Sequence, residues 1–353
     1  MNKIPIISLF CGCGGLDLGF TLEGFEILVA FDISEPPTKT YNFNHGGQVA
    51  KVADLTKLDG KDIFHIIKDK RPGIAPRGVI GGPPCQTFSQ SNVHIKEDDT
   101  RRTLPGRFAE ILSELNEYYE LDFFVFENVR GITFNRHKKE FSRFRILFEE
   151  AGFTLCESLL DAQYFGVPQK RPRVFVVGIN KRRYPGLEFR FPQSEPTHFV
   201  TVAEAIRGLP EPKYFERNLK PSDIPVHPNH WTMQPKSRKF CNGSLVEGQN
   251  GGRSFRVLSW NRPSWTVAYG NREIHIHPSG KRRLSIYEAM LLQGFPKGYQ
   301  LFGTFSEQVQ QVSDAVPPPL AAALARSVRQ FLENNTDSLA GTGIDGYSFN
   351  RRK

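Results

Sequence analysis

Cys85 stands in the segment Gly-Gly-Pro-Pro-Cys-Gln, residues 81–86, where the neighbouring residue types favour chemistry over packing. Both prolines fix their φ angles, so the thiol is held on a stiff loop. An isolated cysteine is more often a small core residue, but the polar residues Gln86 and Ser89 follow closely and argue against burial. We predict that Cys85 is a nucleophile, because a thiolate is strongly nucleophilic and is also a workable leaving group.

A glycine-rich turn, Cys-Gly-Cys-Gly-Gly at residues 11–15, precedes this loop in the chain. It follows an apolar run at 4–10 and precedes a helical pattern at 16–24. A second apolar run, 26–31, ends on Asp32, roughly 20 residues after the first glycine. This order of strand, glycine turn, helix, strand and acid is typical of a nucleotide-binding βαβ unit. An ordinary βαβ turn with incidental glycines is the alternative interpretation.

Further short strands are expected at 78–80, 122–126 and 173–179, with helical patterns at 108–121 and 141–151 between them. Strands that alternate with helices indicate an α/β fold with a doubly wound, mostly parallel sheet.

Open sheets of this kind bind ligands at the carboxyl ends of their strands. The glycine turn, Asp32, Cys85 and Glu127 all follow expected strands directly. We therefore expect these four features to meet in one site.

Composition restricts the possible partners. The 353 residues carry a formal net charge of +9, which favours a polyanion, and nucleic acid first. Five scattered cysteines show no zinc-finger spacing and an odd count, so we expect no metal and no disulfide scaffold, as in a reducing cytoplasm. No apolar stretch approaches the ~18 to 20 residues of a membrane span, and the N-terminal apolar run is too short for a signal peptide. A cytoplasmic protein without a membrane partner is expected.

The composition changes after about residue 180, where Pro, Gly, Asn, Arg and aromatic residues replace periodic helical patterns. Helical patterns return at 282–292 and 320–332. We expect a catalytic domain formed by 1–180 together with 303–334. A smaller, irregular domain would occupy 181–302, and residues 335–353 would form a polar tail.

Taken in order, these motifs resemble the DNA cytosine-5 methyltransferases of bacterial and archaeal restriction–modification systems, over residues 4–332. The resemblance implies a Rossmann-like methyltransferase domain that uses S-adenosyl-L-methionine (AdoMet), together with a target-recognition domain. The segments that carry it are Phe10–Leu16, Asp54-Leu55, Gly82–Gln86, Glu127–Val129, Gln169–Arg173 and Arg283–Pro296.

The family's chemistry would assign roles to four residues. Cys85 would attack C6 of a cytosine, and Glu127 would stabilise the change at N3. Arg173 would lie near O2, where a fixed cation stabilises developing negative charge. Arg171 is the second arginine of this motif, with a backbone or support role. Because the ring faces are inaccessible in a duplex, the target base must be extruded.

The resemblance also implies cofactor and DNA contacts. Residues 92–106, after the nucleophile loop, would form a lid over DNA. The region 184–272, where basic residues are interleaved with tryptophans, would read the sequence: basic residues would position phosphates, and Arg, Asn and Gln would read base edges. The positions that match the cofactor site are Phe10, Gly12, Gly14, Gly15, Leu16, Asp32, Ile33, Asp54, Leu55, Pro84, Asp314 and Val316. The expected duplex-DNA contacts are Gln86, Ser89, Arg101, Arg253, Arg256 and Arg272. A cognate restriction endonuclease is the expected functional partner, and a monomer suffices for one active site.

One position departs from the family. Where its members read Gly-Asn-x-Val-Pro, this chain has Asp314 in the segment 313–317. The substitution predicts either altered AdoMet binding or a weakened enzyme.

Three alternatives stay open. A tRNA cytosine-5 methyltransferase would share the catalytic motifs but carry Cys-Phe-Thr, whereas Cys241 is followed by Asn242. A catalytically inactive DNA-binding module would not require the intact nucleophile and glutamate motifs. A flavin or nicotinamide oxidoreductase would account for the glycine turn alone.

Overall fold

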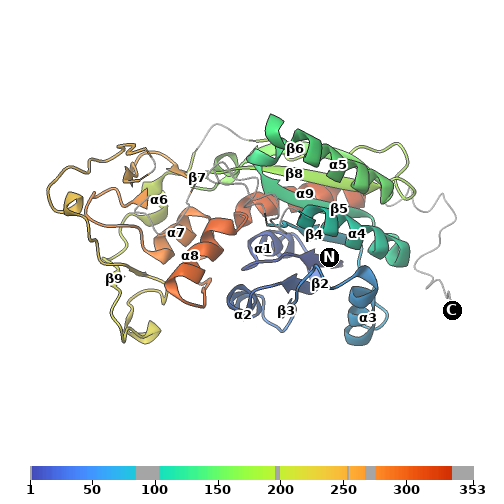
Figure 1. Cartoon of the computed structure of the whole chain (residues 1–353), viewed down its shortest axis with the longest axis horizontal. Helices are drawn as coiled ribbons and strands as arrows, with labels where there is room; N and C mark the ends of the chain where they lie inside the picture. The colour runs from blue at the N-terminus through green and yellow to red at the C-terminus, as the bar shows by residue number, and fades with distance from the viewer. Residues whose placement is uncertain (1, 85–102, 195–198, 253, 267–274, 336–353) are drawn as a thin grey trace.

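The computed structural model describes residues 2–84, 103–194, 199–252, 254–266 and 275–335. Its centre is a seven-stranded sheet with the order β3-β2-β1-β4-β5-β8-β6 (Figure 1). Every neighbouring pair is parallel except those of β8, which runs antiparallel to both β5 and β6. The predicted mostly parallel α/β sheet is confirmed. The strands are β1 (Ile4–Leu9), β2 (Phe25–Asp32), β3 (Ala50–Val52), β4 (Gly78–Gly81), β5 (Phe123–Val129), β6 (Phe153–Asp161) and β8 (Pro172–Asn180).

Strand β1 shows why the N-terminal run is apolar without alternation. Ile4 and Ile6 pack into the core on one face of the sheet, whereas Ile7 and Leu9 pack into the core on the other. Since helices cover both faces, successive side chains are all buried, and the strand reads as a continuous apolar run.

Six helices form the two outer layers (Figure 1). Side chains of α1 (Gly15–Leu22), α2 (Glu35–Asn44) and α9 (Pro318–Asn334) belong to one core, and those of α3 (Gly60–Lys70), α4 (Leu104–Tyr119) and α5 (Lys138–Glu150) to the other. None of the helices in the described ranges is long and apolar enough to cross a membrane.

The C-terminal helix α9 packs directly against α1. A Cβ atom on Gly19 of α1 would lie only 2.4 Å from the Cβ of Ala321 in α9. This close approach joins the end of the sequence to the glycine turn that precedes α1, which places the residues just before α9 beside that turn.

A smaller body lies beside the sheet (Figure 1, left). It consists of short helices, α6 (Val202–Ile206) and α7 (Ile286–Leu292), and two-residue strand pairs. A third core joins them to Val309 and Val312 of α8 (Phe305–Asp314), beyond the predicted boundary at 303. The division into domains therefore stays a prediction. The strand pairs are β9 (Lys213–Tyr214) with β10 (Trp231–Thr232), β11 (Arg256–Val257) with β13 (His275–Ile276), and β7 (Gln169–Lys170) with β12 (Ser264–Trp265).

Several elements differ from the sequence-based expectations. The helix expected at 282–292 begins only at Ile286, because Ser285 caps it with its side chain and Arg283 forms a β-bridge with Ile276. Apart from the short elements of the smaller body, five elements were not predicted at all. Helix α2 begins Glu-Pro-Pro and has a weak apolar stripe, and β3 is three residues long. The unpredicted elements are α2, α3, α8, β3 and β6.

Candidate active site

The carboxyl ends of four adjacent strands meet at one edge of the sheet. In the parallel register, Leu9 of β1 pairs with Phe31 of β2 and with Gly81 of β4, and Gly81 pairs with Phe126 of β5. The next residues along these strands are the glycine turn, Asp32, Gly82 and Glu127. The structure therefore brings the predicted cofactor turn and the predicted glutamate to the same edge.

Asp32 fixes the glycine turn. Its Oδ2 accepts a hydrogen bond from the backbone N–H of Gly12 at 3.0 Å, and its Oδ1 accepts one from Ser34 at 2.9 Å. Burial raises the pKa of Asp32, although these two donors oppose the shift. The turn itself requires left-handed backbone at Gly12, with φ at 53°. Phe10 also has a positive φ, 56°, so the chain turns sharply directly after β1.

Residues from distant segments pack beneath the turn. A Cβ on Gly14 would lie 2.5 Å from Nε2 of His45 and 3.0 Å from the hydroxyl of Tyr299. Tyr299 donates a short hydrogen bond to the carbonyl of Cys13, and His45 stacks on Tyr41 at 4.0 Å. Burial lowers the pKa of His45 to about 4, so this imidazole is neutral near pH 7.

The predicted cofactor residues fall into two groups. Ile33 is 68% exposed beside Asp32 and offers an apolar surface to a ligand. Asp54 is also accessible, with Oδ1 accepting hydrogen bonds from the backbone and hydroxyl of Thr56. The side chains of Leu16, Leu55 and Val316 are buried in the cores, so only their backbone groups can face a ligand.

Val316 touches the glycine turn through its backbone. A Cβ on Gly15 would lie 2.3 Å from the carbonyl oxygen of Val316. Only glycine therefore fits at the start of α1 without moving the segment before α9.

Glu127 and Arg173 form an ion pair across adjacent strands. Nε of Arg173 lies 3.0 Å from Oε1 of Glu127, and the carboxyl is only 7% exposed. Burial raises the pKa of Glu127; Arg173 and then Arg171 oppose this shift, whereas Asp314 adds to it. The group thus holds a proton more readily than an exposed glutamate does, as a hydrogen bond to a ring nitrogen would require.

The backbone before the predicted nucleophile lies against Glu127. A Cβ on Gly82 would stand 2.7 Å from Oε2 of Glu127. The buried Asn128 donates to the carbonyl of Pro83 at 3.4 Å, and the half-buried Pro84 follows. Cys85 itself lies outside the described residues.

Arg171 occupies a different place from Arg173. Its side chain is completely buried, and its Nη2 donates to the carbonyl oxygens of Ser313 and Ala315, the latter at 2.8 Å. Gln293 donates to the same Ala315 carbonyl at 2.6 Å. This geometry assigns Arg171 the supporting role rather than contact with a substrate.

Asp314 is therefore held on both sides. It ends α8, and Nε2 of Gln310, one turn earlier, donates to its Oδ2 at 2.6 Å. The side chain is open to water, but surrounding protein raises its pKa, while Arg171 and Arg173 lower it.

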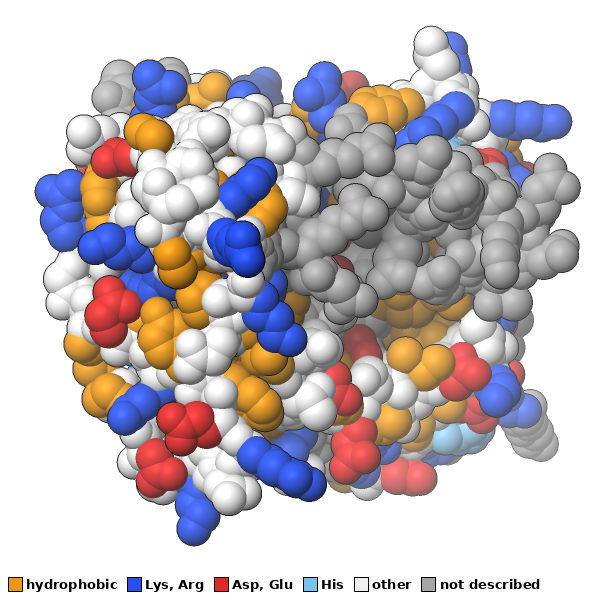
Figure 2. All heavy atoms as spheres, turned by 60° about the vertical axis from the view of Figure 1, so that its left-hand side comes forward, with side chains coloured by type: hydrophobic (Ala, Val, Ile, Leu, Met, Phe, Trp, Pro, Cys, Tyr) orange, Lys and Arg blue, Asp and Glu red, His pale blue; other side chains and the backbone are white. Residues whose placement is uncertain are grey.

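The smaller body presents basic side chains, and Figure 2 shows lysine and arginine spread over its visible face among acidic groups. Arg256 is half-buried, with Nε donating to the carbonyl of Gly252 at 2.6 Å. The predicted DNA contacts at Gln86, Ser89, Arg101, Arg253 and Arg272 lie outside the described residues. The exposed basic residues are Lys213, Arg217, Lys220, Lys236, Arg238, Lys239, Arg262 and Lys281.

The tryptophans of this region belong to the fold. Trp231 is buried in the third core, and Trp260 and Trp265 pack partly against that core. Arg207 stacks over the Trp260 ring at 5.1 Å. Packing therefore occupies these rings, although the tryptophans are interleaved with basic residues in the sequence.

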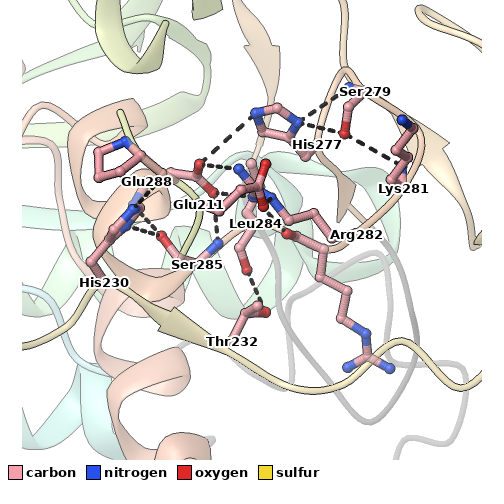
Figure 3. Close-up of polar contacts among 12 residues, drawn as sticks. Glu211, His230, Thr232, His277, Ser279, Lys281, Arg282, Leu284, Ser285 and Glu288 are labelled. Atoms are coloured by element: carbon pink, nitrogen blue, oxygen red, sulfur yellow. Dashed lines mark hydrogen bonds and ion pairs between the residues drawn. The ribbon is translucent and has the colours of Figure 1, made fainter. Parts of the chain in front are cut away.

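A buried ionic network braces the body around α7 (Figure 3). Arg282 donates to both carboxylate oxygens of Glu288, at 2.8 and 2.9 Å, and its Nε contacts the exposed Glu211. Ser285 links Glu288 to His230, whose Nδ1 lies 2.9 Å from the serine hydroxyl. This network holds in place the segment 282–285, which leads into α7. Among the described residues, no group of three or more His, Cys, Asp or Glu side chains is arranged to hold a metal ion.

Known proteins share this arrangement. The family model for C-5 cytosine-specific DNA methylases matches residues 4–330. Type II methyltransferase M.MthTI of Methanothermobacter thermautotrophicus is 33% identical, covering 94% of this chain and 98% of the relative. M.FnuDI of Fusobacterium nucleatum is 32% identical, covering 93% and 95%.

Solved structures agree with the fold. A prophage-encoded protein of E. coli described as a DNA modification methyltransferase has a TM-score of 0.77 at 23% identity, covering 94% of this chain and all of that one. The Dnmt2 methyltransferase of S. pombe has a TM-score of 0.63 at 16% identity, covering 94% and 99%. With the family model spanning nearly all of the sequence, the chain belongs to the C-5 cytosine-specific DNA methylase family.

Proposed function

We propose that this DNA cytosine-5 methyltransferase acts on an extruded cytosine through a covalent bond between Cys85 and C6. The observation that carries the proposal is the Glu127–Arg173 ion pair, 3.0 Å long, placed directly against Gly82 of the nucleophile loop. A nearly buried carboxyl that holds a proton readily and a fixed guanidinium suit the N3 and O2 atoms of a cytosine ring.

In the proposed chemistry, the Cys85 thiolate adds to C6, and electron density moves toward N3 and O2. Glu127 stabilises this density by sharing a proton at N3, and Arg173 by its charge near O2. C5 then becomes nucleophilic enough to take a methyl group. Loss of the C5 proton to a base, for which water suffices, lets Cys85 depart.

Residues at the strand ends fit AdoMet. The Asp32 carboxylate, oriented by Gly12 and Ser34, keeps lone pairs that can accept hydrogen bonds from ribose hydroxyls. Ile33 offers an exposed apolar surface beside it for the adenine. No atom of the described residues lies within 4 Å of a Cβ on Gly12, so this part of the structure leaves room for a ligand at the turn. When bound, AdoMet supplies the methyl group as an electrophilic sulfonium.

The duplex would lie against the smaller body and the nucleophile loop. Exposed lysines and arginines can neutralise phosphates, and the target base must leave the stack to reach Glu127. We retain Gln86, Ser89, Arg101, Arg253, Arg256 and Arg272 as proposed DNA contacts. The methylation would protect host DNA from a cognate restriction endonuclease.

The reaction is tested with AdoMet labelled in its methyl group and mixed duplex DNA. Label should enter DNA with wild-type protein and disappear with Cys85→Ser. The same assay is run with tRNA in place of DNA. Label that enters tRNA but not DNA would instead favour a tRNA cytosine-5 methyltransferase. Bisulfite sequencing of DNA from expressing cells gives the methylated position.

The covalent step has its own test. A duplex with 5-fluorocytosine at the methylated position should form a stable protein–DNA adduct, because fluorine replaces the proton that must leave C5. Active methylation without such an adduct would remove Cys85 from the mechanism. Protection is tested separately, by challenging DNA from expressing cells with endonucleases that cut the methylated sequence.

A further inference from the structure

Asp314 lies between the two halves of the proposed site. Its charge raises the pKa of Asp32 at the end of β2 and that of Glu127 at the end of β5. These strands flank β1 and β4 in the sheet, so the two carboxyls mark opposite ends of the strand edge. The geometry of the next residues places Asp314 near the glycine turn, because a Cβ on Gly15 would lie 2.3 Å from the carbonyl oxygen of Val316 and 3.4 Å from the Cβ of Ala315.

The position of this carboxylate is fixed. Arg171 binds the carbonyls of the residues before and after Asp314, and Gln310 binds its Oδ2. Asp314 therefore cannot swing away easily when a ligand enters. Its side chain is open to water, which screens part of its charge, but the hydrogen bond from Gln310 keeps that charge in one place.

The placement of this acid is electrostatically unfavourable in the free protein. Asp314 is the last residue of α8, where the helix dipole disfavours an anion. Asp32 is a further acidic group that Asp314 influences, whereas Arg171 and Arg173 offset part of the unfavourable charge, and Arg173 is already paired with Glu127. A positively charged ligand in this space would offset the repulsion, whereas a neutral one would not.

We propose that Asp314 is a specificity determinant that favours AdoMet, which carries a positive sulfonium, over its neutral product S-adenosyl-L-homocysteine. The inference rests on the proposed function. If the ribose binds Asp32 and the methyl group must reach a base beside Glu127, the sulfur lies between them, near the glycine turn and the segment that carries Asp314. Since the family usually has a neutral asparagine here, product release would be favoured in this chain beyond what the family pattern provides.

Calorimetric binding to three compounds tests the proposal. They are AdoMet, its homocysteine product, and sinefungin, which carries an ammonium in place of the sulfonium methyl. All three share the same amino-acid tail and ribose. For Asp314→Asn we expect weaker binding of AdoMet and sinefungin by about five- to tenfold, and little change for the product. Added salt should reduce the preference in wild type but not in the variant.

Asp69→Asn on α3 is the matched control, since Asp69 is an exposed acid outside the site, and it should leave all three affinities unchanged. Equal weakening of all three compounds by Asp314→Asn would place the carboxylate on the shared α-ammonium and overturn the inference. An unchanged preference would also overturn it while leaving the proposed function intact. Absence of AdoMet binding by wild-type protein would overturn both.

Discussion

Arg171 and Ala315 are joined by a partly buried hydrogen bond of 2.8 Å from Nη2 to the carbonyl oxygen, although 144 residues separate them. The same nitrogen binds the carbonyl of Ser313. The guanidinium of Arg171, which lies just before β8, thus ties this part of the chain to the segment that carries Asp314. The neighbouring Arg173 turns to Glu127 instead, so two arginines two residues apart have different tasks.

We expect Arg171→Met to lower the free energy of unfolding by about 2–4 kcal/mol, because two partly buried carbonyl groups lose the donor that the fully buried guanidinium provides. Urea denaturation of the protein without ligands measures the loss. Arg182→Met is the matched control: Arg182 is exposed and paired with Glu120 at the surface, and the change should stay within about 0.5 kcal/mol. Equal stability of the two variants would contradict the bracing role.

Gly82→Ala should reduce methylation without unfolding the protein. The new Cβ would stand 2.7 Å from Oε2 of Glu127, so either the carboxyl or the loop must shift. We expect the single-turnover rate to fall by about 100-fold, as for other displaced acid–base groups. Thermal stability and AdoMet affinity should change little. Gly298→Ala, at an exposed position where a Cβ meets no atom of the described residues within 4 Å, should remain fully active. A Gly82→Ala protein with normal rates would show that Glu127 tolerates displacement.

Gly14→Ala should abolish cofactor binding through the residues beneath the turn. Its φ is 90°, and its Cβ would meet His45 at 2.5 Å. Gly73→Ala carries similar backbone strain at φ 82° but no steric contact, so it separates the two effects. Both variants should lose about 1–2 kcal/mol of stability, measured by denaturation. Only Gly14→Ala should also lose AdoMet binding in calorimetry. Equal AdoMet affinity in the two variants would show that the close packing beneath Gly14 is not needed for cofactor binding.

Local patterns predicted the strand edge well. The apolar run at β1, the glycines after it and the acid ending β2 lie close in sequence. Hydrophobic periodicity and turn-forming residues indicate such local segments directly. The same holds for Glu127, which follows a buried strand. What these patterns could not predict is which residues support the edge from far away.

Tyr299 illustrates the limit. Its hydroxyl binds the Cys13 carbonyl, 286 residues earlier in the chain, and no spacing in the sequence indicates that contact. Arg171 and Arg173 have the same side chain, so the sequence alone does not distinguish them. Only the direction of each side chain shows that Arg171 binds backbone carbonyls and Arg173 pairs with Glu127. In the smaller body, the tryptophans interleaved with basic residues lie in or against a core, so proximity in sequence does not show which residues face DNA.

Asp17 gives the pH dependence of stability its clearest test. It is buried beneath the glycine turn, accepts a hydrogen bond from the hydroxyl of Tyr41 at 3.0 Å, and has its pKa raised by burial to about 6. Because the folded pKa lies above the unfolded one, its contribution to stability is fully present below about pH 4 and is lost as the pH rises through about 6.

An Asp17→Asn protein lacks this titration but keeps an acceptor for Tyr41. The stability of wild type relative to Asp17→Asn should therefore fall by about 2 kcal/mol between pH 4.5 and pH 8. Urea unfolding of both proteins at several pH values measures the difference, and taking the difference cancels the other titrating groups. Glu110→Gln on the exposed side of α4 is the control, and its difference from wild type should not follow this curve. If the stability difference between wild type and Asp17→Asn stays constant from pH 4.5 to pH 8, burial does not raise the pKa of Asp17 in the folded protein, and the prediction is wrong.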